Sequence, residues 1–258
     1  MPARFPPNRA PISIHPMQQA SLYLHGIALR AGKVRSFDEY PFTLPAVRHL
    51  KKEVRLRAPV TFLVGENGSG KSTLLEAVAS AFGFDPQGGS RKPLYEALPS
   101  ESGLDDCLYL ERGPRRPSDG FFLRAESFYN VATEVDRREL ASAYGGRSLH
   151  AQSHGEAFLA VFMDRLYGGG FYLLDEPEAA LSPSRQLSVL TRMHDLVGQQ
   201  SQFLIATHSP ILMGYPGADI LLLDEDGIHR VDYEDTEHYF ITREFLLNRE
   251  RMLRELFS

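Results

Sequence analysis

A glycine-rich segment of this chain carries the residue types needed to hold phosphate groups. Three glycines permit backbone angles that a Cβ would forbid, so the loop can curl with its N–H groups facing one anion, and the helix that follows adds partial positive charge. Lys71 is expected to reach the β- and γ-phosphates, and the Ser72 hydroxyl to ligate Mg²⁺. The segment fits G-x-x-x-x-G-K-[ST], and nucleotide contacts are expected from Gly65, Glu66, Asn67, Gly68, Ser69, Gly70, Lys71, Ser72 and Thr73. The alternative is a glycine-rich turn that binds nothing, but the strand before the loop and the helix after it argue against that.

A second segment supplies acidic side chains of the kind that handle magnesium and water. The apolar run at residues 171–174 is followed at once by Asp175 and Glu176, which together form a Walker B element. At the end of a strand, Asp175 is expected to hold Mg²⁺ directly or through water, and Glu176 to orient or deprotonate the attacking water. The alternative is that Asp175 only caps the following segment. The presence of a phosphate loop in the same sequence argues against this alternative.

Two further polar residues follow apolar runs. His208 ends the run at residues 202–207, whose strand should lie beside the Walker B strand, so its side chain is expected at the same crevice. There it would donate a hydrogen bond to the γ-phosphate and so sense whether that phosphate is present. Glu126 ends the run at residues 120–125 and would meet Mg²⁺ or the attacking water, or would instead pair with Arg124 on the surface.

Two aromatic residues precede the phosphate loop. Tyr40 and Phe42 lie upstream of Gly65, at a distance along the chain from which a ring could return to the nucleotide. One of these rings could stack on adenine, or both could be ordinary packing residues. The sequence leaves both readings open and does not identify the adenine contact.

Short apolar runs alternate with helical patterns along most of the chain. Strands are expected at residues 22–29, 42–44, 54–57, 60–64, 108–110, 120–125, 171–174 and 202–207, and in a hairpin formed by residues 220–223 and 228–233. Helices are expected at residues 73–82, 128–140, 153–166, 183–197 and 236–257. Strands that alternate with helices around a phosphate loop predict a mainly parallel sheet, with the ligand at the carboxyl ends of its strands.

Composition restricts the class of protein. A net charge of −5 gives no global basic surface of the kind that drives nucleic-acid binding, although a local basic patch is still possible. The single cysteine, Cys107, excludes an internal disulfide and suits a reducing compartment. We find no apolar run long enough to cross a membrane and no signal peptide, so a soluble, cytoplasmic protein is expected.

Taken in order along the chain, these motifs resemble the ABC-type ATPase superfamily over about residues 22–223. Ser153-His154-Gly155-Glu156 stands where that family has its Ser-Gly-Gly-Gln signature, and Glu126 stands at its Q-loop position. Residues 174–183 look like its Walker B and D-loop run, and Thr207-His208 looks like its switch histidine. The amino-acid sequences of these motifs are similar to those of the stand-alone ATPases of the ABC class, often labelled AAA family or AAA_21-like.

The resemblance implies an α/β fold of the ABC-ATPase head type, a P-loop NTPase whose mainly parallel central sheet is flanked by helices. It adds an antiparallel β part and a small helical signature subdomain at about residues 126–166. Residues 1–20 would be a flexible, proline-rich tail and residues 21–258 a single domain.

The resemblance also implies the composition of the site. The cofactors would be ATP and Mg²⁺, and the protein would form an ATP-dependent homodimer. Catalysis is then expected from Lys71, Glu176 and His208, metal ligation from Ser72, Asp175 and Glu126, and further nucleotide contacts from Ser153, Gly155 and Glu156.

Three residues depart from the family pattern. His154 replaces a glycine of the signature, and Ser182 replaces the usual D-loop aspartate, which affects the details of the dimer contact. Glu126 replaces the usual glutamine, which affects metal coordination at that position. The interval between Lys71 and Ser153 is too short for the long coiled coil of SMC-type heads and contains no heptad run.

Together, these observations predict an ATP-hydrolysing switch that dimerises with nucleotide. Its client, whether protein or nucleic acid, is not identified by the sequence. Three other readings are kept: the ATPase subunit of a transporter, a DNA repair or defence-associated ATPase, and an ATP-binding module with negligible turnover.

Overall fold

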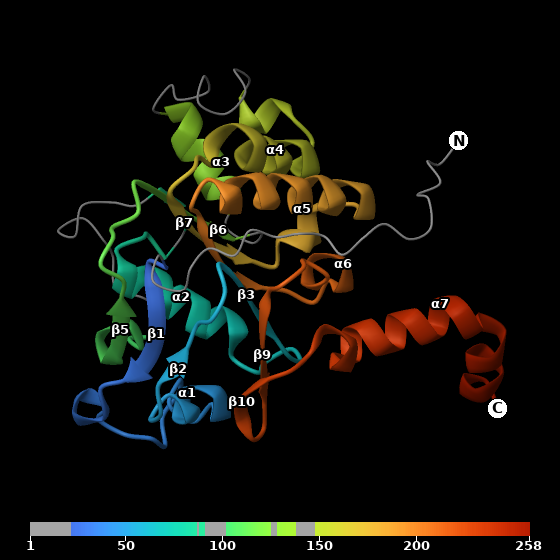
Figure 1. Ribbon diagram of the computed structural model, residues 1–258, viewed down its shortest axis with the longest axis horizontal. Helices are drawn as coiled ribbons and strands as arrows, with labels where there is room; N and C mark the ends of the chain where they lie inside the picture. The colour runs from blue at the N-terminus through green and yellow to red at the C-terminus, as the bar shows by residue number, and fades with distance from the viewer. Residues whose placement is uncertain (1–21, 87, 91–101, 125–127, 138–147) are drawn as a thin grey trace.

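The computed structural model describes residues 22–86, 88–90, 102–124, 128–137 and 148–258 (Figure 1). The expected tail at residues 1–20 and the expected site residue Glu126 lie outside these ranges, so both remain sequence-based predictions.

A seven-stranded sheet forms the centre of the molecule, in the order β10-β9-β3-β8-β7-β6-β4. Its five inner strands run parallel, and the two edge strands pair antiparallel with their neighbours. In chain order these strands are β3 (Val60–Val64), β4 (Gly89–Ser90), β6 (Asp119–Arg124), β7 (Gly170–Asp175), β8 (Gln202–Ala206), β9 (Asp219–Asp224) and β10 (Gly227–Arg230). The mainly parallel sheet expected from the sequence is therefore present.

Continuous apolar runs form the inner strands because helices or a second sheet cover both faces of the main sheet. Every residue of β3, β7 and β8 is buried. Alternate side chains enter two separate cores: Phe62 belongs to one and its neighbour Leu63 to the other. The parallel, doubly covered sheet thus accounts for the lack of polar alternation in these runs.

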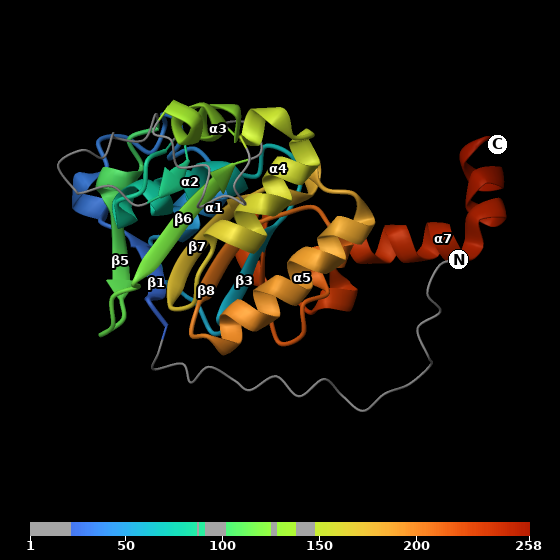
Figure 2. The same cartoon turned by 90° about the horizontal axis from the view of Figure 1, so that it is seen from above.

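The helices divide between the two faces of the sheet (Figure 2). On one face lie α3 (Phe128–Arg137), α4 (His154–Ala160), the π-helical turn η6 (Val161–Arg165), α5 (Pro183–Gly198) and α6 (Pro210–Met213). On the other face lie α1 (Pro45–His49) and α2 (Lys71–Phe82), together with a smaller sheet. Short 3₁₀ turns connect these elements: η2 (Ala31–Lys33), η3 (Asp105–Cys107), η5 (Leu149–Ala151), η7 (Pro177–Ala180) and η8 (Tyr233–Asp235).

The smaller sheet is antiparallel and three-stranded, in the order β2-β1-β5. It comprises β1 (Leu24–Leu29), β2 (Val54–Arg55) and β5 (Leu108–Arg112), and it packs against α2. The buried side chain of Gln202, at the start of β8, joins the two sheets. Its Oε1 accepts hydrogen bonds from the N–H groups of Tyr23 at 2.8 Å and Leu24 at 3.0 Å, and its Nε2 donates to the Leu24 carbonyl at 2.9 Å.

One expected strand is wrong. Residues 42–44 form a turn, and α1 begins directly after it at Pro45. Proline fits the first position of a helix because its fixed φ angle suits the helix and its missing N–H would have had no partner there. Leu44, which precedes it, is extended, and this local geometry made the triplet look like a strand.

The last helix, α7 (Glu237–Leu256), extends away from the sheet (Figures 1 and 2). None of its residues is buried, and its exposed apolar side chains include those of Phe240, Leu246 and Leu247. Its first turn lies against α6 and η8. Among the described residues, no helix is both long and apolar enough to cross a membrane.

Gln202 provides a test of how the two sheets are joined. Replacing it with leucine keeps a similar volume but leaves buried backbone N–H groups of β1 without an acceptor. We expect Gln202→Leu to lower the free energy of unfolding by about 2–4 kcal/mol, measured by urea denaturation. The matched control is Gln199→Leu, because Gln199 is exposed and its backbone bonds are unaffected. A change within error of that control would contradict the role given to Gln202.

Candidate nucleotide site

Three chain segments meet at the carboxyl ends of three inner strands, because β8 lies between β3 and β7 and all three run parallel. The phosphate loop follows β3, Glu176 follows β7, and the segment that contains His208 follows β8. Side chains that are far apart in the sequence are therefore neighbours at the carboxyl ends of these strands, where α/β folds bind ligands.

The loop after β3 wraps around the amine of Lys71. The Nζ atom of Lys71 donates hydrogen bonds to the carbonyls of Gly65 and Glu66, both at 2.8 Å. Burial lowers the pKa of Lys71, while the carboxylates of Glu176, Asp175 and Glu178 act in the opposite direction. A glycine is required at position 65, where φ is +144° and a Cβ would lie 2.2 Å from the Leu223 carbonyl oxygen.

The side chain of Ser72 contacts the Walker B aspartate. Its hydroxyl donates a hydrogen bond to Oδ1 of Asp175 at 2.8 Å. The other oxygen, Oδ2, lies 3.5 Å from Nε of Arg124, which also pairs with Glu76 at 3.0 Å. A pair between Arg124 and Glu126 was the alternative reading of Glu126 from the sequence, and Glu126 lies outside the described residues. Arg124 also partly neutralises Asp175, a contact that the sequence analysis did not predict.

Glu176 lies in a left-handed backbone conformation, with φ 48° and ψ 52°, which is unusual for a residue other than glycine. Its N–H donates to the carbonyl of Ala206 at the end of β8, at 2.9 Å, and Pro177 begins the turn that follows. Such strain persists only where the surroundings hold it, and it is concentrated at functional sites. Its side chain is 42% exposed, so it is accessible at the carboxyl ends of the strands.

The segment after β8 is held by a residue that the sequence analysis did not select. Glu178 accepts hydrogen bonds from the Thr207 hydroxyl at 2.8 Å and from the His208 backbone N–H at 2.5 Å. Burial raises the pKa of Glu178, and these donated hydrogen bonds oppose that rise. Nε2 of His208 lies 3.7 Å from Oε1 of Glu176. The turn after Glu176 and the turn before His208 are thus fixed together.

Two cavities flank the phosphate loop. One, of about 180 Å³, is lined by Tyr40, Leu44, Asn67, Gly68, Gly70, Lys71, Ser72, Thr73 and Glu176. The exposed Tyr40 shares a hydrogen bond of 2.9 Å with Thr73 through the two hydroxyls. The other cavity, of about 560 Å³, lies between the loop, the end of β9 and the start of α7, and His238 is among its lining residues. Tyr40 is therefore beside the loop, whereas Phe42 is partly buried against the core that contains α1 and α2.

The expected signature residues lie in the helical layer, with α4 near α3 and α5 (Figure 1). Glu156 accepts hydrogen bonds from the Ser153 N–H at 3.0 Å and the Ser153 hydroxyl at 2.6 Å, and it pairs with Arg185 at 3.6 Å. Gly155 has no room for a side chain, since a Cβ would lie 2.6 Å from the Ala180 carbonyl oxygen. Ser153 does not line either cavity beside the phosphate loop. One chain thus brings Lys71, Ser72, Asp175, Glu176 and His208 together and keeps Ser153, Gly155 and Glu156 apart from them.

The described residues fit a nucleotide with its magnesium ion. Within the described part of the chain, the Ser69 hydroxyl and Nε2 of His208 are buried without a hydrogen-bond partner, as atoms that serve a ligand would be. Ser72 and Asp175 offer oxygen ligands, which Mg²⁺ prefers. No group of three or more His, Cys, Asp or Glu side chains in the described ranges could hold a metal ion.

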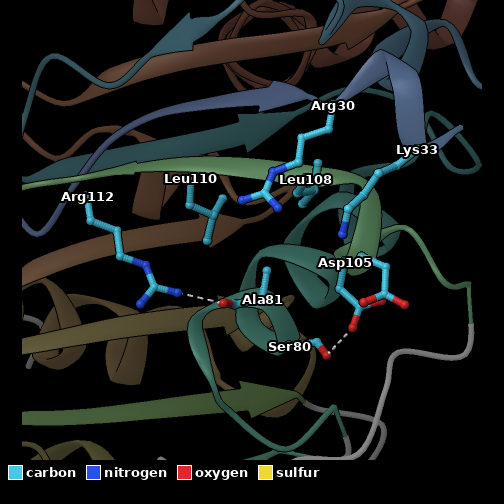
Figure 3. Close-up of a pocket in the computed structure, with 9 residues that line it drawn as sticks. Arg30, Lys33, Ser80, Ala81, Asp105, Leu108, Leu110 and Arg112 are labelled. Carbon is cyan, nitrogen blue, oxygen red and sulfur yellow. Dashed lines mark hydrogen bonds between the residues drawn. The ribbon is translucent and has the colours of Figure 1, made fainter. Parts of the chain in front are cut away.

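A further cavity, of about 350 Å³, lies between β5, η2 and the last turns of α2 (Figure 3). Arg112 donates to the Ala81 carbonyl at 2.7 Å, and the Ser80 hydroxyl donates to Asp105 at 2.7 Å, as the dashed lines show. This cavity is at the carboxyl end of α2, where the helix dipole is negative, whereas the phosphate loop precedes the opposite end. Arg30 and Lys33 line it, but the described residues around it form no loop of backbone N–H groups for phosphates.

Gly155 allows a test of the contact between α4 and η7. The new methyl group of Gly155→Ala would collide with backbone at Ala180, so we expect the free energy of unfolding to fall by about 1–3 kcal/mol. Gly198→Ala is the matched control, because nothing lies within 4 Å of the point where its Cβ would sit and the residue ends α5. Urea denaturation of both variants measures the difference. Equal stability of the two would contradict the close contact.

Three comparisons with known proteins bear on this site. A family model described as an AAA domain matches residues 33–108. The hemin import ATP-binding protein HmuV of Pseudomonas aeruginosa is 30% identical over 192 residues, which cover 64% of this chain and 72% of that protein. An uncharacterized ABC transporter ATP-binding protein of Haemophilus influenzae is 27% identical over 184 residues, covering 63% of this chain and 69% of that one.

Solved structures with a similar arrangement include cbiO1 of Clostridium perfringens, part of the ABC transporter complex cbiONQ. It is 19% identical, with a TM-score of 0.45, over 79% of this chain and 90% of that one. The SMC head domain of Thermotoga maritima is 16% identical, with a TM-score of 0.43, over 82% of this chain and all of that one. The match to HmuV extends over most of both chains. The chain therefore belongs to the ABC-type ATPase superfamily.

Proposed function

We propose that this protein binds and hydrolyses ATP and acts as a switch that dimerises in a nucleotide-dependent manner. The observation that carries the proposal is the meeting of Lys71, Ser72, Asp175, Glu176 and His208 at one edge of the sheet. Family membership supports ATP binding, and the position of Glu176 supports turnover. A module that only held ATP would have no use for a carboxylate in this strained position.

The proposed reaction is in-line attack of water on the γ-phosphorus, with ADP as the leaving group. Glu176 accepts the proton of the water, and its left-handed backbone fixes where its carboxylate can lie. Lys71 exchanges its two carbonyl partners for phosphate oxygens, and the loop N–H groups add further donors. His208 donates to the γ-phosphate through Nε2. When bound, Mg²⁺ would be held by Ser72 and Asp175 and would neutralise developing negative charge.

We assign the adenine contact to Tyr40. Tyr40 is 64% exposed and lines the cavity to which Lys71 and Thr73 also contribute. The Thr73 hydroxyl holds its hydroxyl, so a flat base can stack on the exposed ring. Phe42, the other ring considered from the sequence, is partly buried against the core.

The proposed dimer follows from the place of the signature helix. Ser153 precedes α4 as its N-terminal cap, where its N–H and hydroxyl donate to Glu156, and it does not line the cavities beside the phosphate loop of its own chain. A second copy, turned by a two-fold axis, can place its Ser153 opposite Lys71. Each ATP would then lie between one chain's loop and the partner chain's signature. In this proposal the protein works in the cytoplasm.

A transporter subunit is the second candidate function, because the two relatives are named as an import ATP-binding protein and an ABC transporter ATP-binding protein. A transporter subunit would use the same site, but the closure of its dimer would change the conformation of a membrane partner. The two functions therefore share their chemistry and differ in the client. Recovery of this protein with a membrane protein from a detergent extract would favour the second candidate.

Glu176→Gln separates binding from hydrolysis. The amide keeps the shape of the side chain but cannot accept the proton, so we expect ATP hydrolysis to fall by about 100-fold or more, with ATP still bound. An ATP-dependent dimer should then accumulate, as measured by size-exclusion chromatography with light scattering. Phosphate release measures the turnover.

The control is Lys71→Ala, which removes the charge that the loop holds and should abolish both ATP binding and the dimer. Hydrolysis at the wild-type rate by Glu176→Gln would remove Glu176 from the mechanism. A dimer that forms equally with and without ATP would contradict the switch while leaving hydrolysis intact.

A further inference from the structure

A second histidine lies directly against His208. Nδ1 of His208 and Nε2 of His238 are 2.9 Å apart, which is a hydrogen-bond distance, and the two ring centroids are 5.1 Å apart. His238 is in the first turn of α7, on a segment that the sequence motifs do not include. One imidazole must donate the shared proton and the other must accept it.

The position of His238 is fixed by contacts around it. Thr236, which precedes α7, is buried, and its hydroxyl donates to the Tyr233 carbonyl at 2.7 Å. The Tyr233 hydroxyl donates to the carbonyl of Pro210, two residues after His208, at 2.8 Å. The Tyr233 ring also packs on Tyr239, with centroids 4.5 Å apart. These contacts tie the start of α7 to the segment that contains His208.

The free nitrogen of the His208 ring faces the reaction site. Nε2 is buried, has no hydrogen-bond partner among the described residues, and lies 3.7 Å from a carboxylate oxygen of Glu176. If Nε2 carried a lone pair, the carboxylate and any phosphate bound beside Lys71 would repel it. A proton on Nε2 would instead face both negative groups favourably. In a neutral ring this places the lone pair on Nδ1, toward His238.

We propose that His238 is a positioning residue that donates its Nε2–H to Nδ1 of His208 and so holds His208 in the tautomer whose Nε2–H points at the γ-phosphate. This inference rests on the proposed function, because it names the regulation of the same site. It makes the start of α7 part of that site. Displacement of this turn would withdraw the donor and let the His208 ring adopt its other tautomer.

Burial is the main factor that favours neutral rings for both residues, because it lowers both pKa values. Burial lowers the pKa of His208, and the nearby Lys71 acts in the same direction, while Glu176 opposes them. Burial also lowers the pKa of His238, and His208 and Lys71 add to this, while Glu237 and Glu178 oppose it. Two neutral imidazoles share one proton along their line of contact, so the direction of that hydrogen bond sets both tautomers.

Nuclear magnetic resonance of ¹⁵N-histidine-labelled protein tests the tautomer without any turnover. We expect His208 in the wild-type protein to be the Nε2–H form, assigned by comparison with His208→Ala. In His238→Phe the ring loses its donor, and we expect a mixture of the two tautomers. The Nδ1–H form in the wild-type protein would overturn the proposal, even if the protein proved to be an active ATPase.

Kinetics provide the second measurement. His238→Phe should lower kcat about tenfold with the KM for ATP nearly unchanged, as expected when one hydrogen bond that acts in the transition state is lost. His238→Gln is the conservative variant, since its amide nitrogen can take the place of Nε2, and it should stay within about twofold of wild type.

A double-mutant cycle shows whether His238 acts through His208. In a His208→Ala background, His238→Phe should cause no further loss of kcat. The same loss in both backgrounds would overturn the proposal, and so would a wild-type kcat for His238→Phe. If the wild-type protein does not hydrolyse ATP, the proposed function fails, whereas the tautomer measured in the wild-type protein still decides the inference.

Discussion

The structure depends on the backbone register of three adjacent parallel strands. Because β3, β8 and β7 pair in fixed register, the phosphate loop, His208 and Glu176 emerge side by side at one edge of the sheet. A shift of one residue would turn each buried side chain to the opposite face and move the residues at the strand ends with it. The two hydrophobic cores that oppose such a shift therefore also maintain the geometry of the site.

Charge compensation is the second constraint on this edge of the sheet. Lys71 is nearly buried, and it is accommodated by two carbonyls and by the carboxylates around it. Asp175 is also buried, and Arg124 and the Ser72 hydroxyl contact its two oxygens. Buried charges that lose one partner are costly, so these groups are held as one network. A nucleotide that enters with magnesium must replace some of these contacts, which connects binding to local rearrangement.

Sequence reasoning succeeded for the strands that precede the two motifs. The phosphate loop and the Walker B pair each follow an apolar run, and the strands predicted from those runs are present as β3 and β7. The chemistry assigned to the residues after them stays a prediction. The adjacency of the strands that carry Asp175 and His208 also followed from the parallel sheet, and it is confirmed by their pairing. The strands of the smaller sheet were also expected from their patterns, at residues 22–29, 54–57 and 108–110, but their antiparallel pairing came only from the family resemblance.

The sequence could not reveal contacts between distant segments. The contacts of His238, Glu178 and Arg124 with the site residues arise from tertiary packing, which the local sequence pattern does not predict. The turn at residues 42–44 was mistaken for a strand because an extended residue before proline resembles one. The roles of Ser153, Gly155, Glu156 and Glu126 stay predictions, the last because Glu126 lies outside the described residues.

The central claim is that one nucleotide lies between the phosphate loop of one chain and the signature of a second chain. Disulfide crosslinking tests it most directly, with Ser69→Cys and Ser153→Cys introduced together into the Glu176→Gln protein. With ATP and Mg²⁺, the account predicts a species of doubled mass on a denaturing, non-reducing gel, absent without ATP. Each single cysteine variant, which retains the buried Cys107, is the control. A crosslink confined to one chain, or none in a protein that binds ATP, would contradict the account.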